Sequence, residues 1–238
     1  MIRVRKAGDI YNSSGEIDNG TFNGRWHFAF AEYYDPRFTH FGTLRVFNDD
    51  TLSPGAVWPL HPHRDIEVVT YCAGGEFRHA DQRGIGGILR KGWVQHTTVG
   101  RGMYHSELNN RPDEPMRFIQ MWFMPSKPDL EPSVEQKEVA KADRKNKLLC
   151  LVSNDAEGAL PIVSDAEVYS SFLEEGNSVT CEFKPGWGGY LYVLEGGPVW
   201  LDGNELGHLD AAMAEKEAAI IIKAKGDCEL LLVKVLVG

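Results

Sequence analysis

The apolar stretches of this chain are short, and this limits the fold more than any other feature of the sequence. Apolar and polar residues alternate in places, and Gly, Pro, Asn or Asp separates one stretch from the next. This spacing is typical of strands rather than helices, and the 25 glycines suit a fold with many tight turns. The pattern predicts an all-β protein built as a sandwich or barrel. The clearest strands are expected at residues 43–47, 67–72, 117–123, 147–152, 190–194 and 230–237.

A proline-rich segment divides the sequence. Pro125, Pro128 and Pro132 exclude a central strand or a helix interior around them. The following residues, 133–145, place apolar side chains among charges with Ser133 in the N-cap position, and we expect one small helix there. We therefore predict an N-terminal domain over residues 1–128, a linker with this helix over 129–147 and a C-terminal domain over 148–238. Five basic residues are expected on a solvated face of the linker: Lys137, Lys141, Arg144, Lys145 and Lys147.

The two predicted domains echo each other weakly. Residues 68–75 read VVTYCAGG and residues 189–197 read GYLYVLEGG, so each is an apolar strand that ends in a pair of glycines. Within 238 residues there is room for two similar β-domains. The sequence thus predicts two related halves.

Charge and composition exclude several classes of protein. The net charge of −9 argues against direct binding of nucleic acid, which needs a clustered positive face. The N-terminus lacks the apolar core of a signal peptide, and no apolar run approaches the ~18 residues of a membrane helix. The cysteines form no C-x-x-C pair, and we expect buried, reduced thiols in a cytoplasmic protein without membrane contact. They are Cys72, Cys150, Cys181 and Cys228.

Three histidines and one glutamate have the spacing of a metal site. His61 and His63 are two residues apart, so their side chains share one face of an extended strand. His105 and Glu107 have the same spacing. Two such strands facing each other would present three imidazoles and one carboxylate, a set that suits Fe, Mn, Co, Ni, Cu or Zn. Alternatively, His61 and His63 lie on the surface and His105 is a hydrogen-bonded core residue.

The longer pattern around these residues resembles the cupins. The first cupin motif, G-x5-H-x-H-x3-E-x6-G, is matched by Gly55, His61, His63, Glu67 and Gly74. The second ends in G-x2-H-x3-N, which appears here as Gly102, His105 and Asn109. The segments HPHRDIEVVTY and GRGMYHSE are more specific than the general cupin motifs. They resemble the pirin family of bicupins, in particular bacterial pirin-like proteins described as quercetin 2,3-dioxygenases.

The resemblance implies a bicupin of two β-barrel, jelly-roll domains. It implies metal ligands at His61, His63, His105 and Glu107, while Glu67, a ligand in many other cupins, is kept as a structural residue. It also implies a C-terminal domain without a metal, where the only histidine is His208. Two positions depart from the family: Trp93 stands where Asp is usual and His96 where Trp is usual.

The activity implied is a metal-dependent dioxygenase that opens a flavonol ring with O2 and releases carbon monoxide. Glu107 would be the general base that takes the proton of the 3-hydroxyl group. Iron is the first expectation for the metal. Candidate partners for the second ring nitrogens of the ligands are Asp65, Glu67 and Asp81. Apolar walls for a flat substrate are expected from Trp58, Trp93, Met103, Phe118 and Trp122.

Two other functions fit the same motif. Some pirins resemble transcriptional cofactors, so the chain could be a metal-binding regulatory protein with a protein partner. A cupin isomerase acting on a phosphorylated sugar would need cations near the site, where the sequence offers Arg64, Arg78 and Arg101.

Overall fold

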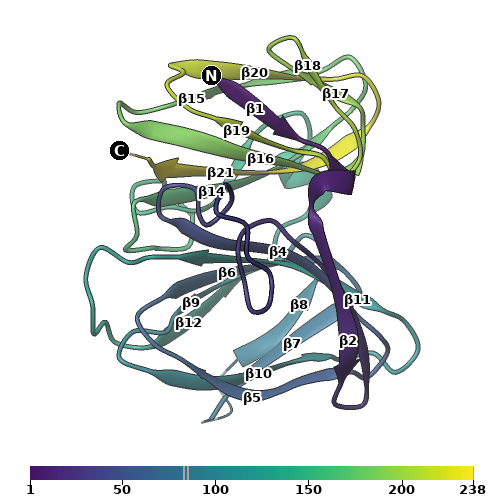
Figure 1. The fold of residues 1–238 in the computed structure, drawn as a ribbon, viewed down its shortest axis with the longest axis vertical. Coiled ribbons are helices and arrows are strands. Elements are labelled where there is room, and N and C mark those ends of the chain that lie inside the picture. Colours follow the sequence, from purple (N-terminus) through teal and green to yellow (C-terminus); the bar gives the residue numbers. More distant parts are fainter. Residues whose placement is uncertain (83, 85, 238) are drawn as a thin grey trace.

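Four antiparallel sheets, stacked as two sandwiches, make up the protein (Figure 1). The structure, a computed structural model, describes residues 1–82, 84 and 86–237. Each sandwich has one large and one small sheet, and the two large sheets face each other in the middle of the molecule. The described helical residues form two short 3-10 turns, η1 (Ala7–Asp9) and η2 (Lys141–Arg144).

The first sandwich, in the lower half of Figure 1, contains most of the N-terminal half of the chain. The order of strands in its large sheet is β12 (Ser133–Lys137), β9 (Val94–Thr98), β6 (Glu67–Gly74), β11 (Met116–Phe123), β4 (Leu44–Leu52), β3 (Gly20–Trp26) and β2 (Tyr11–Ile17). The order in its small sheet is β5 (Val57–His63), β10 (Met103–Asn109), β7 (Glu76–Asp81) and β8 (Gly86–Arg90).

The second sandwich repeats this plan. Its large sheet runs β1 (Ile2–Arg5), β19 (Ala211–Ala214), β16 (Trp187–Gly196), β21 (Cys228–Leu236), β14 (Ala166–Leu173) and β13 (Leu149–Val152). Its small sheet runs β15 (Ser178–Glu182), β20 (Ala219–Ala224), β17 (Val199–Leu201) and β18 (Asn204–Leu206). The orders β9-β6-β11-β4 and β19-β16-β21-β14 match strand for strand, as do the two small sheets.

The glycine pairs end equivalent strands, β6 and β16, as the sequence echo predicts. Gly75 and Gly196 have φ of +68° and +70°, a conformation that L side chains rarely adopt. A Cβ atom on Gly75 would lie 2.6 Å from the Pro115 carbonyl oxygen, and one on Gly196 would lie 2.0 Å from the Asp227 carbonyl oxygen. Both turns therefore need glycine for conformation and for space.

Four predictions about the fold can be compared directly with the structure. The all-β class is confirmed, and each of the six strands expected most clearly overlaps an observed strand. The cysteines are free, and three of the four are buried. The predicted barrels are instead open sheets packed face to face, because edge strands such as β2 and β12 do not close onto each other. In the part of the chain that the structure describes, no helix is long and apolar enough to cross a membrane.

The helix expected over residues 133–145 is wrong for most of its length, since only η2 (Lys141–Arg144) is helical there. Residues Ser133–Lys137 form strand β12, which pairs with β9 at the edge of the large sheet. Hydrogen bonding to an available edge has overridden the local helical pattern. The expectation that Arg144 is solvated is also wrong, because this side chain is buried and its Nη1 lies 2.8 Å from Glu229 Oε1.

The first strand crosses between the halves. β1 pairs with β19, so Ile2–Arg5 lies in the sheet of the second sandwich, although the sequence placed these residues with the N-terminal domain. The chain then passes through η1 into β2 of the first sandwich (Figure 1). This exchange and a shared apolar core join the sandwiches. Core residues include Phe47, Tyr71 and Met121 from one large sheet and Tyr190 and Leu231 from the other.

Candidate metal centre

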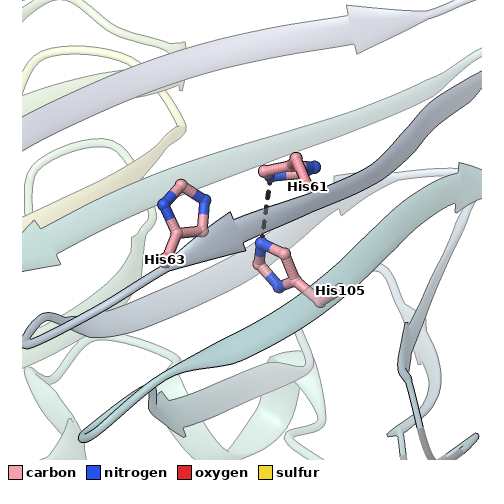
Figure 2. A group of neighbouring side chains, drawn as sticks. All are labelled: His61, His63 and His105. Carbon is pink, nitrogen blue, oxygen red and sulfur yellow. Dashed lines mark hydrogen bonds between the residues drawn. The ribbon is translucent and has the colours of Figure 1, made fainter.

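The candidate site lies on two neighbouring strands of the small sheet, β5 and β10. Their antiparallel register sets His105 opposite His61 and Met103 opposite His63. His61 and His63 project from β5 and His105 projects from β10 (Figure 2). Because side chains two residues apart lie on the same face of a strand, His61 and His63 both lie on the face that His105 also occupies.

The three imidazoles form a compact cluster. One ring nitrogen from each of His61, His63 and His105 lies within 4.8 Å of the others, and His61 Nε2 is 3.1 Å from His105 Nε2. His105 is 3% exposed, whereas His61 and His63 are half-buried. Such a cluster of nitrogen donors is suited to a divalent transition metal.

Hydrogen bonds on the far side of the rings orient this cluster. His61 Nδ1 donates to the Pro59 carbonyl oxygen at 2.8 Å, so its Nε2 keeps a lone pair that faces the cluster. His105 Nδ1 is 2.9 Å from His79 Nε2. His63 Nε2 has no hydrogen-bond partner among the described residues. Nitrogen lone pairs that meet at one point, with few protein donors to satisfy them, fit a bound cation.

Two of the three imidazoles, those of His63 and His105, are also in the protonation state that a metal needs. Burial, with the neighbouring His105 and His61, lowers the pKa of His63 to about 4. Burial and His61 lower the pKa of His105 to about 4 as well. At neutral pH both rings are uncharged and can offer lone pairs to a metal.

Glu107 lies beside the histidine cluster rather than within it. A β-bulge separates His105 from Glu107, so that Glu107 pairs with Trp58. The carboxylate is buried and accepts a hydrogen bond from Gln120 Nε2, whose own Oε1 accepts one from Trp122 Nε1 at 2.9 Å. It is not among the groups that lie mutually within 4.8 Å. Glu107 does line the same cavity as His61 and His63.

Glu67 lies between the sandwiches and is not part of the cluster of His61, His63 and His105. It accepts hydrogen bonds from the Val163 amide at 2.8 Å and from the Ser164 amide and hydroxyl group at 2.7 Å each. His96 Nε2 lies 3.3 Å from the same carboxylate. Burial alone would raise the pKa of Glu67, but the neighbouring His96 and the hydrogen bonds from Val163 and Ser164 hold it below its usual value. These contacts support a structural role for Glu67.

Two expectations about the surroundings of the site need correction. His96 was expected in the cavity or on the surface, but it is buried between the sandwiches beside Glu67. The partner of His105 is His79, which the sequence did not suggest, and His61 is oriented by a main-chain carbonyl group. Glu67 and Asp65 make their described hydrogen bonds to other groups, Asp65 with Arg64 and Asp129.

An aromatic cavity of about 450 Å³ opens next to the histidines. A chain of ring contacts leads from the histidines into the cavity: His63 lies 4.7 Å from Trp122, and Trp122 lies 5.3 Å from Phe30, measured between ring centroids. Of the expected walls, Trp58, Phe118 and Trp122 line the cavity, while Trp93 and Met103 pack in the apolar clusters that flank it. Sequence reasoning missed three further aromatic wall residues, although they stand in an aromatic-rich stretch: Phe22, Trp26 and Phe30.

The equivalent place in the second sandwich has apolar packing. β15 and β20 correspond to β5 and β10, and their inward residues belong to an apolar core. These residues are Val179, Cys181, Ile220 and Ile222. His208 lies exposed, outside these two strands. The duplicated fold therefore carries its histidine cluster in the first sandwich.

Comparison with known proteins agrees with this architecture. The pirin family profile matches residues 10–123, and the profile described as the quercetinase C-terminal cupin domain matches residues 150–235. A pirin-like protein of Caulobacter vibrioides is 38% identical over 225 residues, covering 94% of this chain and 96% of the relative. The chain belongs to the pirin family.

Other relatives of this pirin have names that include an activity or a metal. A protein of Escherichia coli K12 named quercetin 2,3-dioxygenase is 33% identical over 98% of this chain and 97% of its own length. The crystal structure of the bacterial pirin YhhW from Escherichia coli in complex with nickel(II) matches with a TM-score of 0.90 and 31% identity, covering 99% of both chains.

Proposed function

We propose that this pirin is a metal-dependent dioxygenase that opens the central ring of a flavonol with O2 and releases carbon monoxide. One observation carries the proposal: three imidazoles converge at an aromatic cavity of about 450 Å³. Such a cavity has the size and lining of a site for a small flat molecule. The quercetin 2,3-dioxygenase names of several relatives support the same activity.

The metal would be held by His61, His63 and His105, with Glu107 as a fourth ligand. We propose iron first, with Mn, Co, Ni, Cu and Zn as alternatives, because the ligand types do not select among them. When bound, a divalent metal supplies a Lewis-acidic centre with open positions for a substrate oxygen and O2. Its charge of +2, combined with −1 on Glu107, would leave a centre that attracts an anionic flavonolate.

Glu107 is proposed as the general base. Its carboxylate lines the cavity, so it can receive the proton of the flavonol 3-hydroxyl group. The hydrogen bonds from Gln120 to Glu107 and from Trp122 to Gln120 hold the carboxylate in place. Trp122 also contacts His63, so one side chain positions both the base and a ligand.

The aromatic walls would bind the flat rings of the substrate and exclude water. Offset stacking and edge-to-face contacts are the arrangements that aromatic rings prefer, and Phe30 already meets Trp122 edge to face. We also propose a cytoplasmic location, since free cysteines persist in a reducing compartment.

The test combines metal analysis with an aerobic assay on quercetin. We expect the metal-loaded protein to consume O2 and release carbon monoxide in equal amounts. His61→Ala and His105→Ala should lose bound metal and turnover, whereas Glu107→Gln should lose turnover by about 100-fold or more. His208→Ala, an exposed histidine of the second sandwich, is the matched control.

Two results would count against the proposal. Metal-loaded protein without turnover would refute the dioxygenase and favour a metal-binding regulatory protein. Unchanged metal content in His61→Ala would refute the ligand assignment. The sugar isomerase has less support, because Arg64, Arg78 and Arg101 are absent from the described residues that line the cavity.

A further inference from the structure

Two polar side chains of β4, Asn48 and Asp50, line the aromatic cavity and take no part in the histidine cluster. They alternate along the strand with Phe47 and Asp49, which face the second sandwich. Each has a polar group that the protein leaves available, as the following contacts show.

Asn48 is 2% exposed, yet its Oδ1 accepts no hydrogen bond from any described residue. An amide buried in this way is costly unless a partner satisfies it. The carboxamide can present either its oxygen or its amino group to a ligand, since its orientation is set by the hydrogen bonds around it.

Asp50 is 6% exposed, and one of its oxygens accepts a hydrogen bond from Trp26 Nε1 at 3.1 Å. Burial, with a smaller contribution from the nearby Asp49 and Glu107, raises the pKa of Asp50 to about 8. At neutral pH the group is therefore mostly a carboxylic acid, which can both donate and accept a hydrogen bond. No lysine or arginine stands among the described residues that line the cavity, so no cation there pairs with it.

The register places Asn48 and Asp50 at successive levels away from Trp122 and His63, with Asp50 the farther of the two. Asn48 pairs with Gln120 and Asp50 pairs with Phe118, while Trp122, which contacts His63, pairs with Val46. Along the strand, the level of Trp122 is two residues from that of Asn48 and four from that of Asp50, or about 7 and 13 Å. A molecule that reacts beside His63 and lies along β11 would bring its remote end to Asn48 and Asp50.

Gly24 makes room for this arrangement. It pairs with Asp50 across β3 and β4, and a Cβ atom on it would lie 2.1 Å from Asp50 Oδ1 and 2.8 Å from Trp26 Nε1. The bond between Trp26 and Asp50 thus depends on a glycine at this position.

We propose that Asn48 and Asp50 form a specificity subsite that hydrogen-bonds a phenolic hydroxyl group on the end of the substrate remote from the histidines. The preferred substrates are then elongated aromatic enols that carry a hydroxyl group at that end. This inference rests on the proposed function, because the histidines define which end of the substrate reacts.

The test uses three flavonols that differ only in the hydroxyl groups of the remote ring: galangin has none, kaempferol one and quercetin two. Binding to the metal-loaded protein is measured without O2 by quenching of tryptophan fluorescence, and kcat/KM is measured in air. We expect galangin to bind about tenfold more weakly than kaempferol or quercetin, the effect of one buried hydrogen bond of about 1.4 kcal/mol.

Variants locate the effect. Asn48→Leu and Asp50→Leu should each reduce the preference for hydroxylated flavonols severalfold, and Asp50→Asn, which keeps a donor, should retain most of it. Thr51→Val, on the same strand but outside the cavity lining, is the control and should keep the full preference.

The outcomes separate this inference from the function beneath it. Equal affinity of the wild-type protein for all three flavonols would overturn the subsite and leave the dioxygenase intact, and this comparison needs no variant to fold. An undiminished preference in both leucine variants would also overturn it. Failure to bind or convert any of the three would overturn the proposed function and the subsite together.

Discussion

Replacing Arg117 by methionine should destabilise the protein strongly, because it leaves a carboxylate buried without its cation. Arg117 Nε and Nη2 donate to the two oxygens of Asp49 at 2.7 and 2.6 Å, and the Asp49 side chain is 0% exposed. Tyr192, from the other sandwich, also donates to Asp49 at 2.6 Å. This ion pair therefore lies in the interface that joins the two halves.

The magnitude follows from these contacts. Removing one partner of a buried ion pair costs about 3–5 kcal/mol, and the remaining bond from Tyr192 places the expected loss near the lower end, at about 3 kcal/mol. For a chain of this size each kcal/mol shifts Tm by about 2–4 °C, so we expect a decrease of roughly 6–12 °C. Burial alone would lower the pKa of Arg117, but the Asp49 carboxylate raises it above its usual value, so the arginine is charged throughout.

Urea unfolding followed by tryptophan fluorescence measures the effect. Arg101→Met is the control, since Arg101 and its partner Glu131 are 63% and 70% exposed and their pair should contribute less than about 1 kcal/mol. The double variant with Asp49→Asn removes the stranded charge and should regain at least about 1 kcal/mol relative to Arg117→Met. The reasoning is refuted if Arg117→Met is as stable as Arg101→Met, or if the double variant is less stable than Arg117→Met.

Three further predictions concern pH, a turn and the metal. Burial would raise the pKa of Glu167, but hydrogen bonds led by that from Lys234 lower it to about 2. The contribution of Glu167 to the free energy of unfolding is therefore complete above pH 4.5 and lost as pH falls through 2. Glu167→Gln should cost about 2 kcal/mol in urea unfolding at pH 7 and little at pH 2. Gly196→Ala should lower the free energy of unfolding by about 3 kcal/mol, since its Cβ would meet a carbonyl oxygen at 2.0 Å. Gly203→Ala, with φ of +88° and open space, should lower it by about 1 kcal/mol, and similar losses in the two variants would contradict the steric explanation. Nickel or ferrous ion at about 100 times its Kd should stabilise the wild-type protein by about 2.7 kcal/mol in thermal unfolding and leave the stability of His105→Ala unchanged. An equal shift of Tm in the wild-type protein and the variant would contradict binding at the cluster.

The sequence predicted best what depends on local periodicity. The alternation of His61 and His63 is a property of any strand, so their common face followed from spacing alone, and the match to the cupin motifs added His105. The helix expected over residues 133–145 failed because its local pattern could not reveal that the edge of β9 was available for pairing. Arg144 was misplaced for a related reason, since its partner Glu229 lies 85 residues away and is brought near only by the fold.

The parts of the site that escaped prediction depend on contacts between distant strands. His79 reaches His105 across the pairing of β7 with β10, and neither periodicity nor motif indicates that contact. Gln120 holds Glu107 from the opposite sheet of the sandwich. Residue type can suggest a ligand, but the groups that orient it become visible only once the sheets are packed.

The two sandwiches show how one fold divides stability and chemistry. The second is filled by a continuous apolar core, and its inward residues on β15 and β20 belong to that core. The interior of the first is divided: smaller apolar clusters flank a cavity that contains histidines, Asn48, Asp50 and Glu107, groups that are expensive to bury without partners. The apolar interface between the large sheets, with the Arg117–Asp49 pair inside it, is the contact through which the second sandwich can offset that cost. A chain of two such halves can therefore keep a polar cavity in one of them, because the other supplies packing that the cavity removes.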